Sequence, residues 1–299
     1  MAILSQNEPH EKKSAAISSV IAAVGLTGFK LIVGFATGSL GILAEAAHSG
    51  LDLMAALMTF LAVLISGKPA DSNHLYGHGK VENLSALFET LLLLVTCIWI
   101  LYEATHRLLY HSADLEVNYW SFAVMITSIV VDVSRSRMLY RAAKKYNSQA
   151  LEADALHFRT DIWSSGVVIL GLFLVKLSEW VPSLAFLRQA DSVAAILVGL
   201  IVVYVSIQLG IRTIQALLDV APSGIEKKII SAVEVLPGVT DCHHVRVRHS
   251  GPQIFVDIHV LLEGNQSLVK AHNLTEEIER VIQKLIPNAD VIVHPEPNL

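Results

Sequence analysis

The sequence is poor in cysteine and in charged residues, and each shortage narrows what the protein can be. Its 299 residues include two cysteines, Cys97 in an apolar run and Cys242 far away in a polar region. Such a pair indicates neither a disulfide framework nor a thiolate zinc site, so any bound metal must be held by histidine and carboxylate side chains. Charged residues make up 16% of the chain, and a net charge of −5 offers no basic surface for nucleic acid.

Motifs of the common nucleotide and zinc enzymes are also missing. There is no Walker loop, no G-x-G-x-x-G and no H-E-x-x-H, and the HEKK at His10 does not complete one. The polar opening MAILSQNEPHEKK has no apolar core and no small-residue cleavage site, so we expect no removable signal peptide. We predict a protein that is not an enzyme and that needs no cofactor.

Apolar residues, in contrast, are abundant. They make up 53% of the chain, and the mean hydropathy is +0.53, which is typical of an integral membrane protein. Six apolar stretches approach the length of about 20 residues that a helix needs to cross a bilayer. They lie at 14–37, 40–66, 82–108, 118–140, 155–178 and 191–218. The sequence therefore predicts six transmembrane helices.

The composition changes from Pro222 onward. IEKKIISAVEVLPGV and SLVKAHNLTEEIERVIQKLIP are amphipathic at helical spacing, whereas HHVRVRHSGPQIFVDIHVLLEG alternates as two strands about SGP, and DVIVH reads as a further short strand. We predict two domains, a transmembrane domain at 1–221 and a small soluble α/β domain at 222–299.

Basic residues gather on one side of the predicted membrane. They precede the first stretch and fill the loops after the second and the fourth: Lys12, Lys13, Lys68, Lys80, Arg135, Arg137, Arg141, Lys144 and Lys145. Since cytoplasmic loops carry the excess of lysine and arginine, both termini and the soluble domain are predicted to be cytoplasmic, in a multi-pass protein of the cell (inner) membrane.

The second apolar stretch contains ionisable residues, in the segment AEAAHSGLD. A charge at the centre of a membrane helix costs roughly 2.5 to 3.5 kcal/mol, so such residues usually line a site or a pathway. His48 and Asp52 are four residues apart and share one helix face, with Glu45 one turn earlier. By itself this pattern fits a hydrogen bond between helices equally well.

The fifth stretch repeats the pattern. His157 and Asp161 have the same spacing, again with a carboxylate one turn earlier, Asp154. Two imidazoles and two carboxylates suit a tetrahedral divalent cation of the zinc type, with bonds of about 2.0–2.2 Å. Four protein ligands leave no open position for a catalytic water, which favours a carrier site. In the weaker alternative, an intramembrane metallohydrolase, Glu45 or Asp154 would have to act as general base.

The loop between the second and third stretches, KPADSNHLYGHGKVEN, holds a smaller group. Asp71, His74 and His78 are spaced three and four residues apart, beside Gly77 and Gly79. Taken alone, this spacing is more typical of a solvated polar turn than of a metal site.

At this point the chain resembles the cation diffusion facilitator family over essentially its whole length. In that family paired ligand motifs lie on the second and fifth spans, and the matching residues here are His48, Asp52, His157 and Asp161. The resemblance implies six spans with cytoplasmic termini, a cytoplasmic domain of ferredoxin-like or metallochaperone-like fold, and a homodimer that exports divalent metal in exchange for protons.

The expected metal depends on one residue that differs between this chain and the branch of the family that it resembles. The tail PGVTDCHHVRVRHSGPQIFVDIHV is similar to the bacterial iron/zinc efflux branch, which usually has aspartate where this chain has His48. The His-Asp/His-Asp combination is similar to zinc-type members and disfavours manganese. We expect a Zn²⁺/H⁺ antiporter; efflux of Fe²⁺, Co²⁺ or Cd²⁺ by the same site, or a metal sensor or scaffold that does not transport, remain alternatives.

The resemblance also implies three further roles. Asp71, His74 and His78 match a second metal site of the family, and Lys80 matches a lysine that pairs with an aspartate, here Asp219. Metal ligands of the cytoplasmic dimer interface match His243, His259, His272, His294 and Glu296. Glu296 stands where aspartate is usual, and the neighbouring His244 and His249 match no ligand position.

Proton exchange follows from the chemistry of the donors. Histidine and carboxylate ligands bind metal when unprotonated, so occupancy by metal displaces protons. Zinc is thus expected as the transported substrate and, in the soluble domain, as a regulatory ligand.

Overall fold

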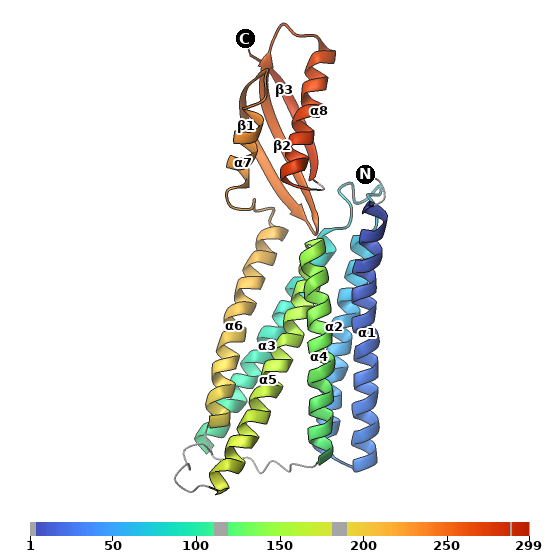
Figure 1. Ribbon diagram of the computed structural model, residues 1–299, viewed down its shortest axis with the longest axis vertical. Coiled ribbons are helices and arrows are strands. Elements are labelled where there is room, and N and C mark those ends of the chain that lie inside the picture. Colours follow the sequence, from blue (N-terminus) through green and yellow to red (C-terminus); the bar gives the residue numbers. More distant parts are fainter. Residues whose placement is uncertain (1–3, 111–118, 181–189, 288, 299) are drawn as a thin grey trace.

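The computed structural model of the protein describes residues 4–110, 119–180, 190–287 and 289–298. A bundle of long helices is followed by a small α/β unit at one end (Figure 1). The long helices are α1 (Leu4–Thr37), α2 (Leu40–Ser66), α3 (Lys80–Tyr110), α4 (Tyr119–Tyr146), α5 (Gln149–Trp180) and α6 (Ala190–Leu217). The predicted fold class is confirmed.

Four of the described helices, α1, α2, α3 and α6, are long and apolar enough to cross a membrane on their own. The described parts of α4 and α5 are not among these four, and they carry the buried charged residues Asp132, Arg135 and Asp154. At 1.5 Å per residue, the 28 residues of α4 measure about 42 Å, more than the hydrocarbon thickness of about 30 Å. Its last turns, with Lys144 and Lys145, therefore extend beyond the hydrocarbon.

The helices pack as neighbours in pairs, α1 with α2, α3 with α6, and α4 with α5. Small residues permit close approach: a Cβ added to Gly199 of α6 would lie 2.7 Å from a methyl carbon of Leu101 on α3. A further contact joins α2 to α5. That contact brings together the ionisable residues of the second and fifth apolar stretches.

The α/β unit contains a sheet of three described strands, β1 (Val239–Ser250), β2 (Gln253–Glu263) and β3 (Ala289–Asn298). The central strand β2 runs antiparallel to β1 and parallel to β3. A parallel neighbour requires a crossover, which α8 (Leu268–Leu285) supplies between β2 and β3, while α7 (Ile225–Val233) precedes β1.

Alternation along β2 decides which face of the sheet holds the core. Val256, Ile258 and Val260 are buried in one cluster with Ile278 and Ile282 of α8. Because successive side chains of a strand point to opposite faces, His259 lies on the face turned away from α8. That second face presents polar residues.

The α/β unit docks on the helix bundle through the turn between β1 and β2. The backbone N–H of Gly251 donates to Oδ1 of Asn83 on α3 at 2.8 Å, and Gly251 adopts a φ of +59°. Gly79, just before α3, lies so close to the turn that an added Cβ would be 2.0 Å from the carbonyl oxygen of Ser250. Beside it, the guanidinium of Arg248 stacks 3.9 Å from the ring centre of Tyr76.

The close contact at Gly79 leads to a testable expectation. Gly79→Ala should displace the β1–β2 turn and break the bond from Gly251 to Asn83, because a methyl group has no space there. Loss of about 1 kcal/mol should speed hydrogen exchange of the Gly251 amide roughly fivefold, while the amide of Val256 stays protected. Gly25→Ala is the matched control, since its Cβ would meet nothing within 4 Å. Unchanged exchange at Gly251 in Gly79→Ala would contradict this account of the docking.

Candidate metal centre

Four side chains converge between α2 and α5, and they are the two pairs that the sequence singles out. Across the helices, Nε2 of His157 lies 3.0 Å from Oδ1 of Asp52, and Nε2 of His48 lies 3.9 Å from Oδ1 of Asp161. Within each helix, the separations are 3.9 Å from His48 to Asp52 and 3.7 Å from His157 to Asp161. We call these four residues the membrane site.

The separations match the size of a tetrahedral coordination shell. Metal–ligand bonds of about 2.0–2.1 Å imply ligand atoms about 3.3–3.4 Å apart along each edge of a tetrahedron. The four separations above, from 3.0 to 3.9 Å, straddle that length. The ligand atoms of His48, Asp52 and Asp161 lie within 4.8 Å of one another, close enough to hold one cation, and His157 lies beside Asp52.

Burial differs among the four residues of the membrane site. The side chains of His157, Asp52 and Asp161 are 9%, 12% and 18% exposed, whereas that of His48 is 40% exposed. Three of the four side chains thus lie in the protein interior, and His48 lies at its border.

The carboxylates one turn before each pair, Glu45 and Asp154, do not join the four ligands. Glu45 is largely exposed and pairs with Nζ of Lys30 at 3.3 Å. Asp154 is buried and accepts a hydrogen bond from the hydroxyl of Ser19 at 3.4 Å. Neither residue is placed as the general base of a hydrolytic site.

Sequence reasoning missed the polar layer around Asp154. Arg135 of α4 donates to the same Ser19 hydroxyl at 3.0 Å and stacks on Phe158, and Glu89 of α3 accepts from Thr59. One carboxylate oxygen each of Glu89 and Asp154 is buried without a hydrogen-bond partner. This layer adjoins the membrane site on the side of the α/β unit, because Asp154 precedes His157 on α5.

A second buried carboxylate, Glu82, lies closer to the α/β unit. It accepts hydrogen bonds from Lys12 of α1, from Ser66 of α2 and from Ser148 just before α5. We call this group the Glu82 network. Glu82 and Glu89 are seven residues apart on α3 and so lie on one helix face. Two carboxylates at that spacing in an apolar helix are the sequence signal that could have revealed both the Glu82 network and the polar layer around Asp154.

The loop before α3 brings its three predicted residues together. Oδ1 of Asp71 lies 3.1 Å from Nδ1 of His74, and Oδ2 lies 3.3 Å from Nε2 of His78. Backbone N–H groups of His74 and Asn73 also donate to this carboxylate and hold its pKa below the usual value. The three donors lie within 4.8 Å of one another, close enough to hold one cation.

The predicted pairing of Lys80 with Asp219 is present in the structure. Nζ of Lys80 lies 2.9 Å and 3.0 Å from the two carboxylate oxygens of Asp219 and also donates to the carbonyl of Leu217. Asp219 has a φ of +58°, which turns the chain from α6 toward the α/β unit. The ion pair therefore ties the start of α3 to the end of α6.

Three histidines form a row across the sheet. The strand register pairs His243 with His259 and His259 with His294, so all three share the face turned away from α8. Glu296 reaches back to the row: Oε1 lies 2.8 Å from Nδ1 of His259, and Oε2 lies 3.4 Å from Nε2 of His243. The hydrogen bond with His259 lowers the pKa of Glu296. The longer glutamate arm thus reaches the histidines.

His244, which the family pattern leaves out, joins this row. A β-bulge interrupts the register after His243, and His244 adopts a φ of +48°. The extra residue turns His244 to the same face as its neighbour, 5.2 Å between ring centres from His259. Strict alternation would place it on the opposite face, so the sequence pattern alone did not reveal it.

His272 lies apart from this row within one chain, so its predicted role at a dimer interface stays a prediction. It lies on α8, which covers the other face of the sheet, and its side chain is 68% exposed and faces Glu276 at 3.5 Å. Within one chain it does not contact the row of His243, His259 and His294. It can approach that row only from a second copy of the chain.

Comparison with known proteins assigns both parts of the chain. Residues 16–218 match the family model described as "Cation efflux transmembrane domain", and residues 221–298 match "Cation efflux protein, cytoplasmic domain". The cation-efflux pumps FieF of Salmonella arizonae and Salmonella schwarzengrund are each 32% identical over 288 residues, which cover 95% of this chain and 92% of each relative.

Solved structures similar to the α/β unit include two variants of the MamM CTD. One is 24% identical and covers 25% of this chain and 94% of its own, with a TM-score of 0.24. The other, a nickel form, is 22% identical and covers 26% of this chain and 100% of its own, with a TM-score of 0.25. From the family models and the FieF relatives it follows that this chain belongs to the cation diffusion facilitators, a family of multi-pass membrane proteins for divalent cation efflux.

Proposed function

We propose that the protein exports Zn²⁺ in exchange for protons and that the membrane site carries the ion. One observation bears most of this proposal: two imidazoles and two carboxylates from two helices converge, with four His–Asp separations of 3.0 to 3.9 Å. The two nitrogen donors favour zinc over manganese. Efflux of Fe²⁺, Co²⁺ or Cd²⁺ by the same four residues is the alternative within transport.

Proton exchange rests on the same donors. Each ligand must be unprotonated to hold the metal, so a proton that binds His48 or His157 weakens metal binding, and a metal that enters displaces it. Nε2 of His157, which lies 3.0 Å from Oδ1 of Asp52, is an atom that either a proton or the metal can occupy. Metal and proton thus compete for one set of atoms, which is what antiport requires.

Alternating access needs one side of the bundle closed at a time. The Glu82 network joins α1, α2, α3 and the start of α5 on the side of the α/β unit. We assign to it the closure of that side. Opening toward the α/β unit would require the bond from Lys12 to Glu82 to break.

The proposed topology places both termini and the α/β unit in the cytoplasm, across the inner membrane. The basic end of α4 lies at the same end of the bundle as the α/β unit (Figure 1), in agreement with the excess of positive charge in cytoplasmic loops. The division between a transport domain at 1–221 and a cytoplasmic domain at 222–299 belongs to this proposal.

The cytoplasmic domain is proposed to bind regulatory zinc on its polar face and to join two copies into a homodimer. His243, His244, His259 and His294, together with Glu296, offer enough donors there for more than one cation. A second copy seated over this face would bring its own His272 toward the row. The loop group of Asp71, His74 and His78 is proposed as a further, weaker site beside the docking turn.

A transport assay with purified protein in proteoliposomes tests the proposal. Asp161→Asn keeps the shape of the side chain but removes one anionic ligand, so zinc transport driven by an imposed pH gradient should fall by at least about 100-fold. Asp290→Asn, on exposed β3, is the matched control and should transport normally. Full-rate zinc transport by Asp161→Asn would refute the membrane site, and a rate independent of the pH gradient would refute antiport.

The nitrogen donor of His48 is expected to set the choice of metal. His48→Asp replaces it with a carboxylate, which accommodates larger cations because it binds through one oxygen or two. The ratio of cadmium to zinc transport rates should rise several-fold. Glu45→Asp, next to the site but outside the ligand set, should leave the ratio unchanged. An unaltered ratio in His48→Asp would mean that helix packing sets the selectivity.

His244 is expected to act as a zinc ligand in the cytoplasmic domain. In full-length protein that carries Asp161→Asn and His74→Ala, which remove ligands from the membrane site and from the loop group, calorimetric zinc titration should show binding to the tail. His244→Ala should weaken that binding roughly tenfold or more, whereas His249→Ala should not. Equal affinities in the two variants would exclude His244 from the ligand set.

A further inference from the structure

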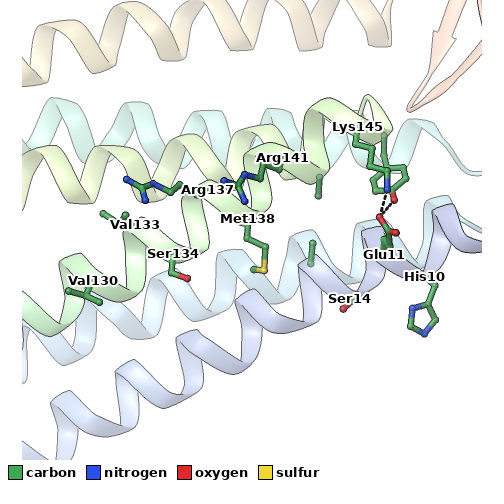
Figure 2. A pocket seen from close by; sticks show the side chains of 13 residues that line it. His10, Glu11, Ser14, Val130, Val133, Ser134, Arg137, Met138, Arg141 and Lys145 are labelled. Carbon is green, nitrogen blue, oxygen red and sulfur yellow. Dashed lines mark hydrogen bonds and ion pairs between the residues drawn. The ribbon is translucent and has the colours of Figure 1, made fainter.

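A groove of about 780 Å³ lies between α1 and α4, at the end of the bundle near the α/β unit. Figure 2 shows its two walls, with His10, Glu11 and Ser14 on α1 and a row from Val130 to Lys145 on α4. The α1 wall is made of small side chains such as Ser14 and Ala15, which leave the space open. The groove is separate from the membrane site and from the histidine row.

The α4 wall changes character along its length. Val130 and Val133 line one end, and Val130 is 63% exposed, as expected of a residue that faces lipid. Arg137, Arg141 and Lys145 follow at intervals of four residues on the same side, each about 6 Å further toward the α/β unit. The groove is therefore apolar deep in the membrane and cationic at its surface.

Two of the three cations are not neutralised by protein. Lys145 is engaged, because Glu11 accepts hydrogen bonds from both Lys145 and Tyr146 (Figure 2). Arg137 and Arg141 are exposed, and in the described part of the chain no carboxylate lies within ion-pair distance of either. With Glu11 as the single acidic residue among those that line it, the groove keeps a net charge of +2.

An anion from the membrane fits this arrangement. Guanidinium groups bind phosphate with two parallel N–H···O bonds, and such a bond is stronger near the hydrocarbon than in water. An uncompensated arginine at a membrane surface also attracts anionic headgroups. A free phosphate would use the two arginines but not the apolar end of the groove, whereas a phospholipid uses both.

We propose that this groove binds an anionic phospholipid of the adjacent leaflet, with its phosphate on Arg137 and Arg141 and an acyl chain along Val130 and Val133. The lipid would bridge α1 and α4. A lipid that binds the folded bundle but not the unfolded chain stabilises the folded state. The bound lipid therefore raises the melting temperature of the protein.

The experiment compares lipids on the full-length protein in detergent. Added phosphatidylglycerol should raise the melting temperature by roughly 5 °C at a concentration a hundredfold above its dissociation constant, and phosphatidylcholine should not. In R137Q/R141Q the shift should be lost, while K144Q/K227Q, which removes two exposed positive charges outside the groove, should retain it. R137K/R141K keeps the charge and should restore part of the shift, which separates lipid binding from a folding defect.

Three outcomes would overturn the proposal. An undiminished shift in R137Q/R141Q would place the lipid elsewhere, and an equal shift with phosphatidylcholine would show a nonspecific bilayer effect. An equal shift with soluble glycerol phosphate would mean that the groove binds a free anion and no membrane lipid. Native mass spectrometry of the same variants should show one phosphatidylglycerol per chain retained in the unmutated protein and lost in R137Q/R141Q.

Discussion

The need to give every charge in the membrane a partner organises the helix bundle. Asp52 and His157 lie in the interior of a bundle that crosses a bilayer, where an isolated charge is costly. His48 and Asp52 of α2 find partners on α5, 3.0 Å away in the closest pair, and Glu45 pairs with Lys30 of α1. The same requirement accounts for Arg135 against Ser19 and Phe158, and for Glu82 with Lys12. Polar contacts thus join α2 to α5, α4 to α1 and α3 to α1, beside apolar contacts such as that of Gly199 with Leu101.

A single region links the helix bundle to the α/β unit. The loop that holds Asp71 and His78 continues into Gly79, which contacts the β1–β2 turn, and then into Lys80, which pairs with Asp219 at the end of α6. A change in the loop therefore reaches the α/β unit through contacts that have little room to adjust. The family models and the FieF relatives identify this chain as a transporter and not an enzyme.

Helix spacing explains why some site residues were predictable and others were not. His48 with Asp52, and His157 with Asp161, are local patterns: four residues apart is one helix turn, and the spacing alone places each pair on one face. Glu89 and Arg135 come from different helices, and their position beside Asp154 depends on how α3, α4 and α5 pack. His244 depends on a β-bulge, which reverses the face that alternation assigns. His272 lies on α8, which covers the opposite face of the sheet from the row.

The sequence by itself determined the number of long helices, the start of the α/β unit and the two His-x-x-x-Asp pairs, because hydropathy and helical or strand period are local properties of the chain. The tertiary structure decided which pairs face each other, which carboxylates remain outside the ligand set, and that Arg137 and Arg141 border an open groove. These outcomes depend on distances between residues tens of positions apart. Such distances are set by the packing of whole helices and sheets, and no local period encodes them.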